Sequence, residues 1–281
     1  MNRNDSIYQY WERMAQQHGT ECRATIPDHY LKILELESIY KHLSDNVKIL
    51  DAGCGNGYSA LQIKKRFRCE ITAVDFSETM IKTAKSEQAL LGIDDGLRFD
   101  LQDILSLGEP DEYYDIAITE RSIINLESWE KQRLAIREIW RVLRPNGLYI
   151  MAEAFEEPLA NLNKVRESLG LSPIQTKWHN IYLSEVRVRE YVQDMFDILT
   201  VDNYSSTYYL LTRAVSPKIG EIEGRATTYT DPINQVAAQL PKTGDFGPQK
   251  IIVFKKTSDS DSSTALFGKG IKAQYPYGMQ L

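Results

Sequence analysis

The chain has 281 residues, of which 42% are hydrophobic and 26% charged, as in an ordinary globular protein with one large domain. Its 33 Lys and Arg against 39 Asp and Glu give a net charge of −6, which argues against a nucleic-acid partner, because phosphate binding normally leaves a basic surface. Cys22, Cys54 and Cys69 have neither CxxC nor Cys/His ligand spacing, so we expect no disulfide framework, no metal site and a reducing, cytoplasmic compartment. Residues 1–5 lack the apolar region of a signal peptide and no stretch approaches the length of a membrane span, so we expect neither export nor a membrane partner.

Two segments with helical periodicity precede the first predicted strand. Residues 6–17 and 28–43 carry apolar side chains at helical spacing. The polar connection between them, residues 18–25, is of the kind that often folds over a ligand. We therefore expect residues 1–45 to form an N-terminal helical lid on a domain that spans residues 46–256.

From residue 48 onward, predicted strands and helices alternate. This order is typical of an α/β fold with a doubly wound, mostly parallel sheet and helices on both faces. Arg144-Pro145-Asn146-Gly147 ends the last of these helices, because proline cannot continue a helix and the following Asn-Gly makes a turn. The strands are predicted at residues 48–51, 70–75, 97–101, 114–119 and 148–152, and the helices at about 58–66, 77–91 and 128–143.

Beyond the fifth strand the periodicity is weaker. Residues 159–169 and 184–196 have helical spacing, and residues 206–212 and 250–255 read as the sixth and seventh strands. The fold therefore carries insertions after strands 5 and 6, at about residues 155–200 and 213–249, which we expect to build an acceptor site. The tail, residues 257–281, has the composition of a flexible segment, although its aromatic end could dock on a partner.

The most informative stretch is the glycine turn after the first strand, within Lys48–Tyr58. Gly53 and Gly55 fit the dinucleotide fingerprint G-x-G-x-x-G, but its third position falls on Tyr58. No Gly-Lys-Ser/Thr follows, which excludes a Walker phosphate loop. The observed pattern is instead D-x-G-x-G-x-G, starting at Asp51.

That pattern resembles motif I of class I S-adenosylmethionine-dependent methyltransferases. Residues 74–77, 101–104 and 114–120 resemble later segments of the same family in order and distance, and with residues 143–148 the resemblance covers about residues 45–155. It implies S-adenosylmethionine as cofactor, bound where parallel strands end and strand order reverses.

The resemblance also implies roles for single residues at these strand ends. Asp75 is expected to accept hydrogen bonds from both ribose hydroxyls, since a carboxylate offers two acceptor oxygens. Asp103 is expected to accept from the exocyclic amine of adenine, and Glu120 lies at the end of the strand that faces the transferred methyl group. The predicted cofactor residues are Asp51, Gly53, Gly55, Gly57, Asp75, Phe76, Asp103, Ile104 and Glu120.

Methyl transfer needs a base only where the acceptor is a hydroxyl or a protonated amine. The candidates are Glu120, Glu153 and His179. Each has an alternative: Glu120 could bind the cofactor or pair with Arg121, and Glu153 could belong to a solvated acidic loop. Tyr8, Trp11, Trp178 and Tyr209 are candidate substrate contacts, although the first two could equally be core residues and Tyr209 could pack in a strand.

Three functions remain open from the sequence. The first is an enzyme that methylates an oxygen or nitrogen of a small molecule such as a sugar, a glycan or a natural-product intermediate. The second is an RNA or protein methyltransferase, which the net charge and the absence of an Asn/Asp-Pro-Pro-Tyr/Phe motif after the fourth strand disfavour for nucleobases. The third is a cofactor-binding subunit without its own activity, and a homodimer is compatible with any of the three.

Overall fold

The architecture comes from a computed structural model that describes residues 3–258, with the side chains of residues 3 and 4 excepted. The sequence-based interpretation of the tail therefore lies outside the described residues from position 259 onward. Among residues 3–258, no helix combines the length and apolar character that crossing a membrane requires. Cys22, Cys54 and Cys69 are buried free thiols, in agreement with the expectation that they form no disulfide framework.

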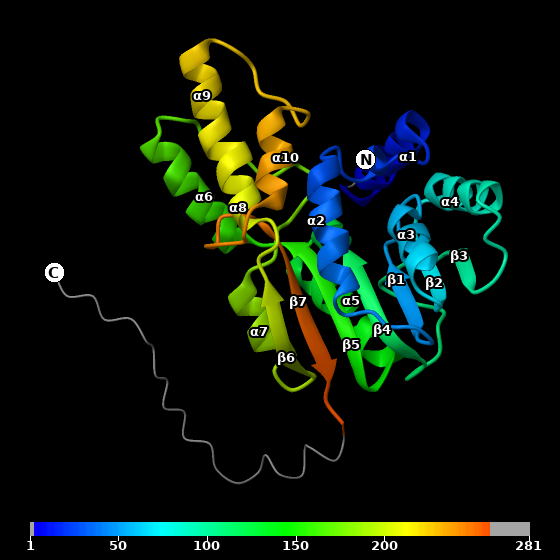
Figure 1. Ribbon diagram of the computed structural model, residues 1–281. Coiled ribbons are helices and arrows are strands. Elements are labelled where there is room, and N and C mark those ends of the chain that lie inside the picture. The colour runs from blue at the N-terminus through cyan, green and yellow to red at the C-terminus, as the bar shows by residue number, and fades with distance from the viewer. Residues whose placement is uncertain (1–2, 259–281) are drawn as a thin grey trace, which may run out of the picture.

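A single seven-stranded sheet forms the centre of the molecule (Figure 1). The strand order is β3-β2-β1-β4-β5-β7-β6, so strand order reverses between β1 and β4. The β3-β2-β1-β4-β5 pairs are parallel, whereas β7 runs antiparallel to both β5 and β6. The predicted α/β class and mostly parallel seven-stranded sheet are confirmed. The strands are β1 Lys48–Ala52, β2 Glu70–Asp75, β3 Leu97–Leu101, β4 Tyr114–Glu120, β5 Leu143–Ala154, β6 Phe196–Asp202 and β7 Gln249–Lys256.

Helices cover both faces of this sheet and rise beyond its carboxyl edge (Figure 1). Several begin at side-chain caps, such as Asp28, Ser77 and Ser128, each of which accepts a hydrogen bond from a backbone amide of the first turn. The α-helices are α1 Arg3–His18, α2 His29–Tyr40, α3 Tyr58–Arg66, α4 Glu78–Leu90, α5 Trp129–Val142, α6 Glu156–Ser168, α7 Glu185–Val192, α8 Ser206–Tyr209, α9 Ser216–Glu223 and α10 Pro232–Gln239. Short 3-10 turns occur at Cys22–Ala24 (η1) and Ile123–Asn125 (η2), and Leu210–Val215 (η3) is a π-helix that joins α8 to α9.

Alternate residues of each strand enter two separate hydrophobic clusters, because successive strand side chains point to opposite faces. Ile49 and Ile118 belong to the cluster formed with α2, α3 and α4, whereas Leu50 and Ala117 belong to the one formed with α5 and α7. Helix α2 supplies Leu31 and Ile39 to the first cluster. Of the two helices assigned to the predicted lid, α2 is therefore part of the core that supports the sheet.

The sixth strand lies elsewhere than predicted. Residues 206–212, predicted as a strand, are helical, and β6 is formed by Phe196–Asp202. A helical conformation is favoured here because Tyr204 and Tyr208, four residues apart, can both pack into the core. In addition, the Thr212 hydroxyl donates to the Tyr208 carbonyl at 2.7 Å. The β propensity of Tyr and Thr is overridden by this burial.

The connection predicted as a long loop, residues 213–249, also contains helices. It includes the end of η3, then α9 and α10, and both α-helices carry Pro in their first turn, where its missing N–H costs nothing. Asn234 of α10 donates to the Tyr208 hydroxyl at 2.8 Å, which ties the connection to the core. The insertion after β6 therefore has a folded structure of its own.

Candidate functional site

A cavity of about 550 Å³ lies at the carboxyl ends of the parallel strands. Its lining comes from α1, the α1–α2 connection, the turns after β1, β2, β3 and β4, and the insertions after β5 and β6. This is the place where ligands bind in open α/β sheets. We call the part lined by the turns after β1, β2 and β3 the donor end, and the part lined by Arg121 and by residues 174–182 and 209–229 the acceptor end.

The glycines of the turn at the donor end have two roles. They leave space for a ligand, and they allow close packing against neighbouring protein atoms. Gly53 (φ 84°) and Gly55 (φ 53°) line the cavity in left-handed conformations, and an added Cβ on Gly53 would stand 2.3 Å from the Ser122 Cβ. Gly57 does not line this cavity. Its backbone precedes α3, and a Cβ there would lie 2.7 Å from the Phe99 ring.

Asp75 is held in the cavity wall by its own turn. One carboxylate oxygen accepts from the Gly55 amide and the other from the Ser77 amide, each at 2.9 Å. Burial raises the pKa of this carboxyl to about 6, against the opposing effect of these backbone bonds. The side chain therefore presents two oriented oxygens, each with acceptor capacity left, to the donor end.

Asp51 lies beside the donor end, in the lining of an adjoining space of about 20 Å³. The side chain is 1% exposed, and neither of its oxygens has a hydrogen-bond partner among residues 3–258. Burial raises the pKa of Asp51 well above its ordinary value, and the nearby Glu120 carboxylate adds to the rise. An unpartnered buried carboxylate at this point is suited to a cationic ligand group nearby.

Phe76, Asp103 and Ile104 line the cavity together with Asp75, as the sequence predicts for one ligand site. The Asp103 carboxylate accepts from the Leu105 amide at 2.9 Å, which fixes the turn after β3. Tyr8 of α1 packs edge-on against Phe76, with ring centroids 5.8 Å apart, but is not among the residues that line the cavity.

Helix α1 is attached to the donor end by one carboxylate. Glu12 accepts from the Ser77 hydroxyl at 2.6 Å, from the Thr79 amide at 3.3 Å and from the Thr79 hydroxyl. These groups belong to the start of α4, directly after Asp75, so Glu12 adds a second cap to that helix. Trp11, one residue earlier, lines the cavity.

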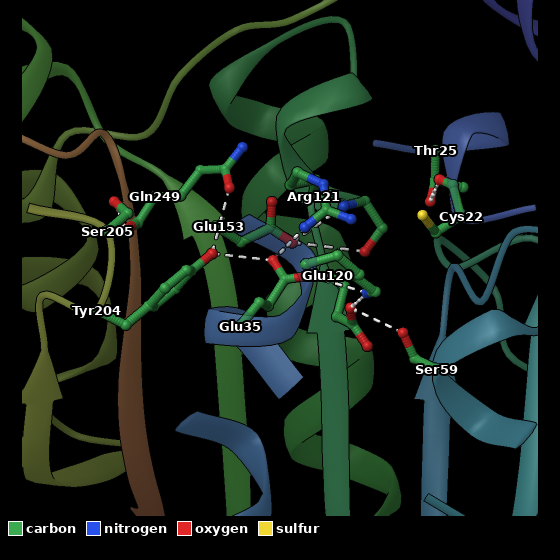
Figure 2. A network of polar contacts seen from close by, with 12 residues as sticks. Cys22, Thr25, Glu35, Ser59, Glu120, Arg121, Glu153, Tyr204, Ser205 and Gln249 are labelled. Carbon is green, nitrogen blue, oxygen red and sulfur yellow. Dashed lines mark hydrogen bonds and ion pairs between the residues drawn. The ribbon is translucent and has the colours of Figure 1, made fainter. Parts of the chain in front are cut away.

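A buried ionic network joins the two ends (Figure 2). The Lys32 ammonium pairs with Glu35 at 2.9 Å and with Glu120, and Arg121 pairs with Glu35. Although burial opposes it, Arg121 and Lys32 hold the pKa of Glu35 far below its ordinary value. The Tyr204 hydroxyl extends the network to Gln249 on β7, bonding Glu35 at 3.0 Å and Gln249 at 3.2 Å.

Glu120 occupies the donor side of this network. One carboxylate oxygen accepts from Lys32 and from the Ser59 hydroxyl at 3.0 Å, whereas the other is buried with no hydrogen-bond partner in the part of the chain that the structure describes. Glu120 lines the cavity, and burial raises its pKa. The sequence offers a contact to the cofactor or a pair with Arg121 as alternatives for Glu120. In the described chain Glu120 pairs instead with Lys32, because Arg121 is paired with Glu35.

Glu153, predicted as a base candidate, does not line the cavity. It is 0% exposed, and its carboxylate accepts from the amides of Ser122, Ile123 and Ile124 at 3.1, 3.1 and 3.4 Å. Burial raises its pKa to about 7, although these amides favour the charged form. Glu153 therefore holds η2 in place, and with it Ser122, which packs against Gly53. It is not positioned to contact a ligand in the cavity.

His179 is buried in the cavity wall among aromatic rings. It stacks on Tyr10 with centroids 4.3 Å apart and meets Trp11 edge-on at 5.6 Å. Trp178 also touches His179 edge-on, but it is 53% exposed and outside the cavity lining. The first lid helix and the insertion after β5 therefore meet at His179.

The acceptor end is lined by tyrosines and cations. Tyr209 and Tyr229 line it, with the Arg213 guanidinium 5.4 Å from the first ring centroid and 4.7 Å from the second. Arg213 also pairs with Asp28 at the start of α2. Among residues 3–258, no group of three or more His, Cys, Asp or Glu side chains is arranged to hold a metal ion.

The structure brings together most of the predicted site residues. Gly53, Gly55, Asp75, Phe76, Asp103, Ile104, Glu120, His179, Trp11 and Tyr209 line the cavity, whereas Asp51, Gly57, Glu153, Tyr8 and Trp178 do not. Lys32 and Glu35 were not predicted from the sequence, and Arg121 was considered only as a possible partner of Glu120. A signal existed for Arg121, since it follows Glu120 directly, but Lys32 and Glu35 look like ordinary solvated positions on a helix.

Comparison with known proteins agrees with this geometry. Residues 43–201 match the family described as a methyltransferase domain. A 27-O-demethylrifamycin SV methyltransferase of Amycolatopsis mediterranei is 25% identical over 58% of this chain and 61% of its own length. A malonyl-[acyl-carrier protein] O-methyltransferase of Bacillus cereus is 30% identical over 45% of this chain and 46% of its own.

A solved structure described as the [4+2]-cyclase SpnF has the same fold, with a TM-score of 0.55 and 22% identity over 80% of each chain. The chain spans about half the length of the curated relatives it matches.

Proposed function

We propose that this chain, which belongs to the class I S-adenosylmethionine-dependent methyltransferases, transfers a methyl group to an oxygen or nitrogen of a small molecule. The observation that carries the proposal is the cavity itself: one space holds both the donor-type residues at the strand ends and a separate end built from the insertions. The structural likeness alone would not carry it, because a cyclase shares the fold.

The donor end fits S-adenosylmethionine. Asp75 would accept the ribose hydroxyls, Asp103 and Ile104 would bind the adenine, and Gly53 and Gly55 would leave room for the rest of the molecule. The buried carboxylate of Asp51, which has no partner, suits the positively charged end of such a ligand. When bound, S-adenosylmethionine supplies an electrophilic methyl group on a sulfonium.

The chain's own contribution is positioning, exclusion of water and, for a hydroxyl or ammonium acceptor, removal of a proton. We propose His179 as the group that accepts this proton, since it lines the cavity between the lid and the acceptor end. Glu120 is the weaker candidate for this base because it is paired with Lys32. Its proposed role is to orient the residues of the donor end. Glu153 acts as a positioning residue that holds the turn carrying Ser122.

The kind of acceptor is supported by the enclosure of the site. Helix α1 and the two insertions surround the cavity, which leaves space for a compact molecule such as a sugar or a natural-product intermediate. One relative is named for a rifamycin, and another for an acyl-carrier protein, so a carrier-bound acceptor or a protein is the alternative. We also propose a biosynthetic role in the cytoplasm, in keeping with three free thiols.

The test is methyl transfer from labelled S-adenosylmethionine. Purified full-length protein is incubated with a small-molecule extract, with total protein and with total RNA, and the label is followed into each. We expect label in the small-molecule fraction alone, with turnover lowered about 100-fold or more by His179→Ala and the affinity for S-adenosylhomocysteine unchanged. Label in protein or RNA contradicts the small-molecule acceptor, and label in none contradicts the enzyme.

A further inference from the structure

Five lysine and arginine side chains line the cavity. Arg23, Arg121, Lys131 and Arg213 line the cavity, and each has a carboxylate within 4.0 Å. Lys177 also lines the cavity, yet within residues 3–258 it forms neither an ion pair nor a side-chain hydrogen bond. Among the lysines and arginines that line the cavity, Lys177 is therefore the one without a carboxylate partner in the described chain.

Lys177 is placed at the cavity by its surroundings. It lies between α6 and α7, and its carbonyl accepts from the Asn180 amide at 2.9 Å in a tight turn beside buried His179. Lys177 is an exposed residue of the cavity wall, and its partial burial together with the nearby Arg121 charge lowers its pKa. Lys177 and Arg121 line the same cavity and repel each other, and no carboxylate of the described chain is bound to Lys177.

Arg121 is directed into the same space by an unusual backbone. Its φ is 55°, a left-handed value that costs energy for a long side chain, and it is held by the Arg121 amide donating to Ala152 at 2.9 Å. The Asn125 side chain donates to the Arg121 carbonyl at 2.5 Å. In the described chain only Nη1 of its guanidinium has a partner, Glu35, so Nε and Nη2 retain their donors.

Two phenol groups add further donors. Tyr182 and Tyr209 line the cavity, and neither hydroxyl is hydrogen-bonded to a described residue. Burial raises the pKa of both, so they stay protonated and can donate. Lys177, Arg121 and these two hydroxyls together form a donor-rich surface that lacks a matching acceptor.

We propose that the methyl acceptor carries an anionic group, a carboxylate or a phosphate, which Lys177 and Arg121 bind at the acceptor end. The proposal rests on the methyl-transfer function proposed above and adds the charge of the substrate to it. The anion offsets the repulsion between the two cations and orients the molecule with its reacting oxygen or nitrogen toward the donor end. Charge-assisted hydrogen bonds of this type are among the strongest in proteins.

The test combines fractionation with variants of Lys177. A small-molecule extract is separated on an anion exchanger, and each fraction is incubated with full-length protein and labelled S-adenosylmethionine. We expect acceptor activity in the retained fractions. Lys177→Met should lower kcat/KM about 10- to 100-fold, mainly through KM, Lys177→Arg should keep most of it, and S-adenosylhomocysteine affinity should not change. Lys164→Met, an exposed lysine of α6 outside the cavity, is the matched control.

Treatment of the active fraction identifies the anion. Loss of acceptor activity after phosphatase indicates a phosphate, and loss after carbodiimide amidation indicates a carboxylate. Acceptor activity in the unretained fraction, or a Lys177→Met enzyme with wild-type kinetics, overturns the proposal.

A second measurement separates this proposal from the proposed function. Inorganic phosphate or malonate is titrated into the complex with S-adenosylhomocysteine while tryptophan fluorescence is followed, since Trp178 is adjacent to Lys177. Saturable binding in the wild type that Lys177→Met abolishes supports the anion site even if no methyl transfer is detected. Equal binding by both proteins, or none by either, contradicts it.

Discussion

The two ends of the cavity differ in charge and in the distance along the chain from which they are assembled. The donor end presents carboxylates and left-handed glycines from successive strand ends between Gly53 and Ile104. The acceptor end presents cations and phenols from segments between Arg121 and Tyr229 that are separated by whole strands and helices. One end is thus built by local turn geometry, whereas the other exists only once the sheet and both insertions are in place.

The largest effect is expected in the ionic network of Lys32, Glu35, Glu120 and Arg121 that joins the two ends. Glu35→Ala leaves Lys32 and Arg121 buried without their shared counter-ion, so we expect the free energy of unfolding to fall by about 3–5 kcal/mol. Glu37→Ala on the same helix removes an exposed pair with Arg66 and should cost about 1 kcal/mol or less. Denaturant unfolding of both variants measures the difference. Equal losses would mean that the network is no more than a surface feature.

Asp75→Ala should separate donor binding from the acceptor end. Removing the acceptor of two ribose hydroxyls should weaken S-adenosylhomocysteine binding by about 2–3 kcal/mol, as measured by calorimetry. Asp100→Ala, one strand away and outside the cavity lining, is the control. Unchanged affinity in Asp75→Ala would refute the assignment of the donor end.

The same carboxyl predicts a pH dependence. Its pKa is raised to about 6, so it gains a proton and loses acceptor capacity as the pH falls through that value. Donor affinity should therefore be greatest above pH 7 and fall about tenfold toward pH 5, and Asp75→Asn should show no such change. A wild-type affinity that is flat or rises toward pH 5 would contradict this protonation scheme.

The smallest effect is expected at the attachment of α1. Glu12→Gln weakens the cap on α4, so α1 should detach from the start of α4 more easily by about 1 kcal/mol, which hydrogen exchange of the α1 amides measures. Bonds from Ser77 and Thr79 lower the pKa of Glu12 despite burial, so this stabilisation is complete above about pH 4.5 and is lost as the pH falls through the lower native value. Glu78→Gln, which affects an exposed pair with Lys82, should leave the exchange unchanged.

The donor end, which is built from turns close together in the sequence, was therefore easier to predict from the sequence than the acceptor end. The glycine turn, Asp75 and Asp103 follow strands whose apolar runs are plain in the sequence, and all were placed correctly on the sheet. The acceptor end was only partly found, through His179 and Tyr209. The ionic network between the two ends could not be predicted, because Lys32 and Glu35 contact residues 85 or more positions away, and nothing in their own helix signals these contacts.

The error in the sixth strand has the same origin. Residues 206–212 have strand-like composition, and only the core that receives Tyr204 and Tyr208 makes them helical. Strand β6 lies at the edge of the sheet, and only its first residue, Phe196, is buried. Contacts with residues distant in the sequence determined the conformation of residues 206–212 and of β6, and the local pattern of a single sequence does not predict such contacts.

The antiparallel β7 has a consequence for how such a protein could change its acceptor during evolution. Asp202 at the end of β6 pairs with Ile251 near the start of β7, so residues 203–248 leave the sheet and return to it at neighbouring positions. The part of this excursion beyond the core residue Tyr208, which carries Tyr209, Arg213 and Tyr229, can be lengthened, shortened or exchanged without shifting the register of any strand. A chimera that receives this segment from a relative should keep its donor affinity while its choice of acceptor changes.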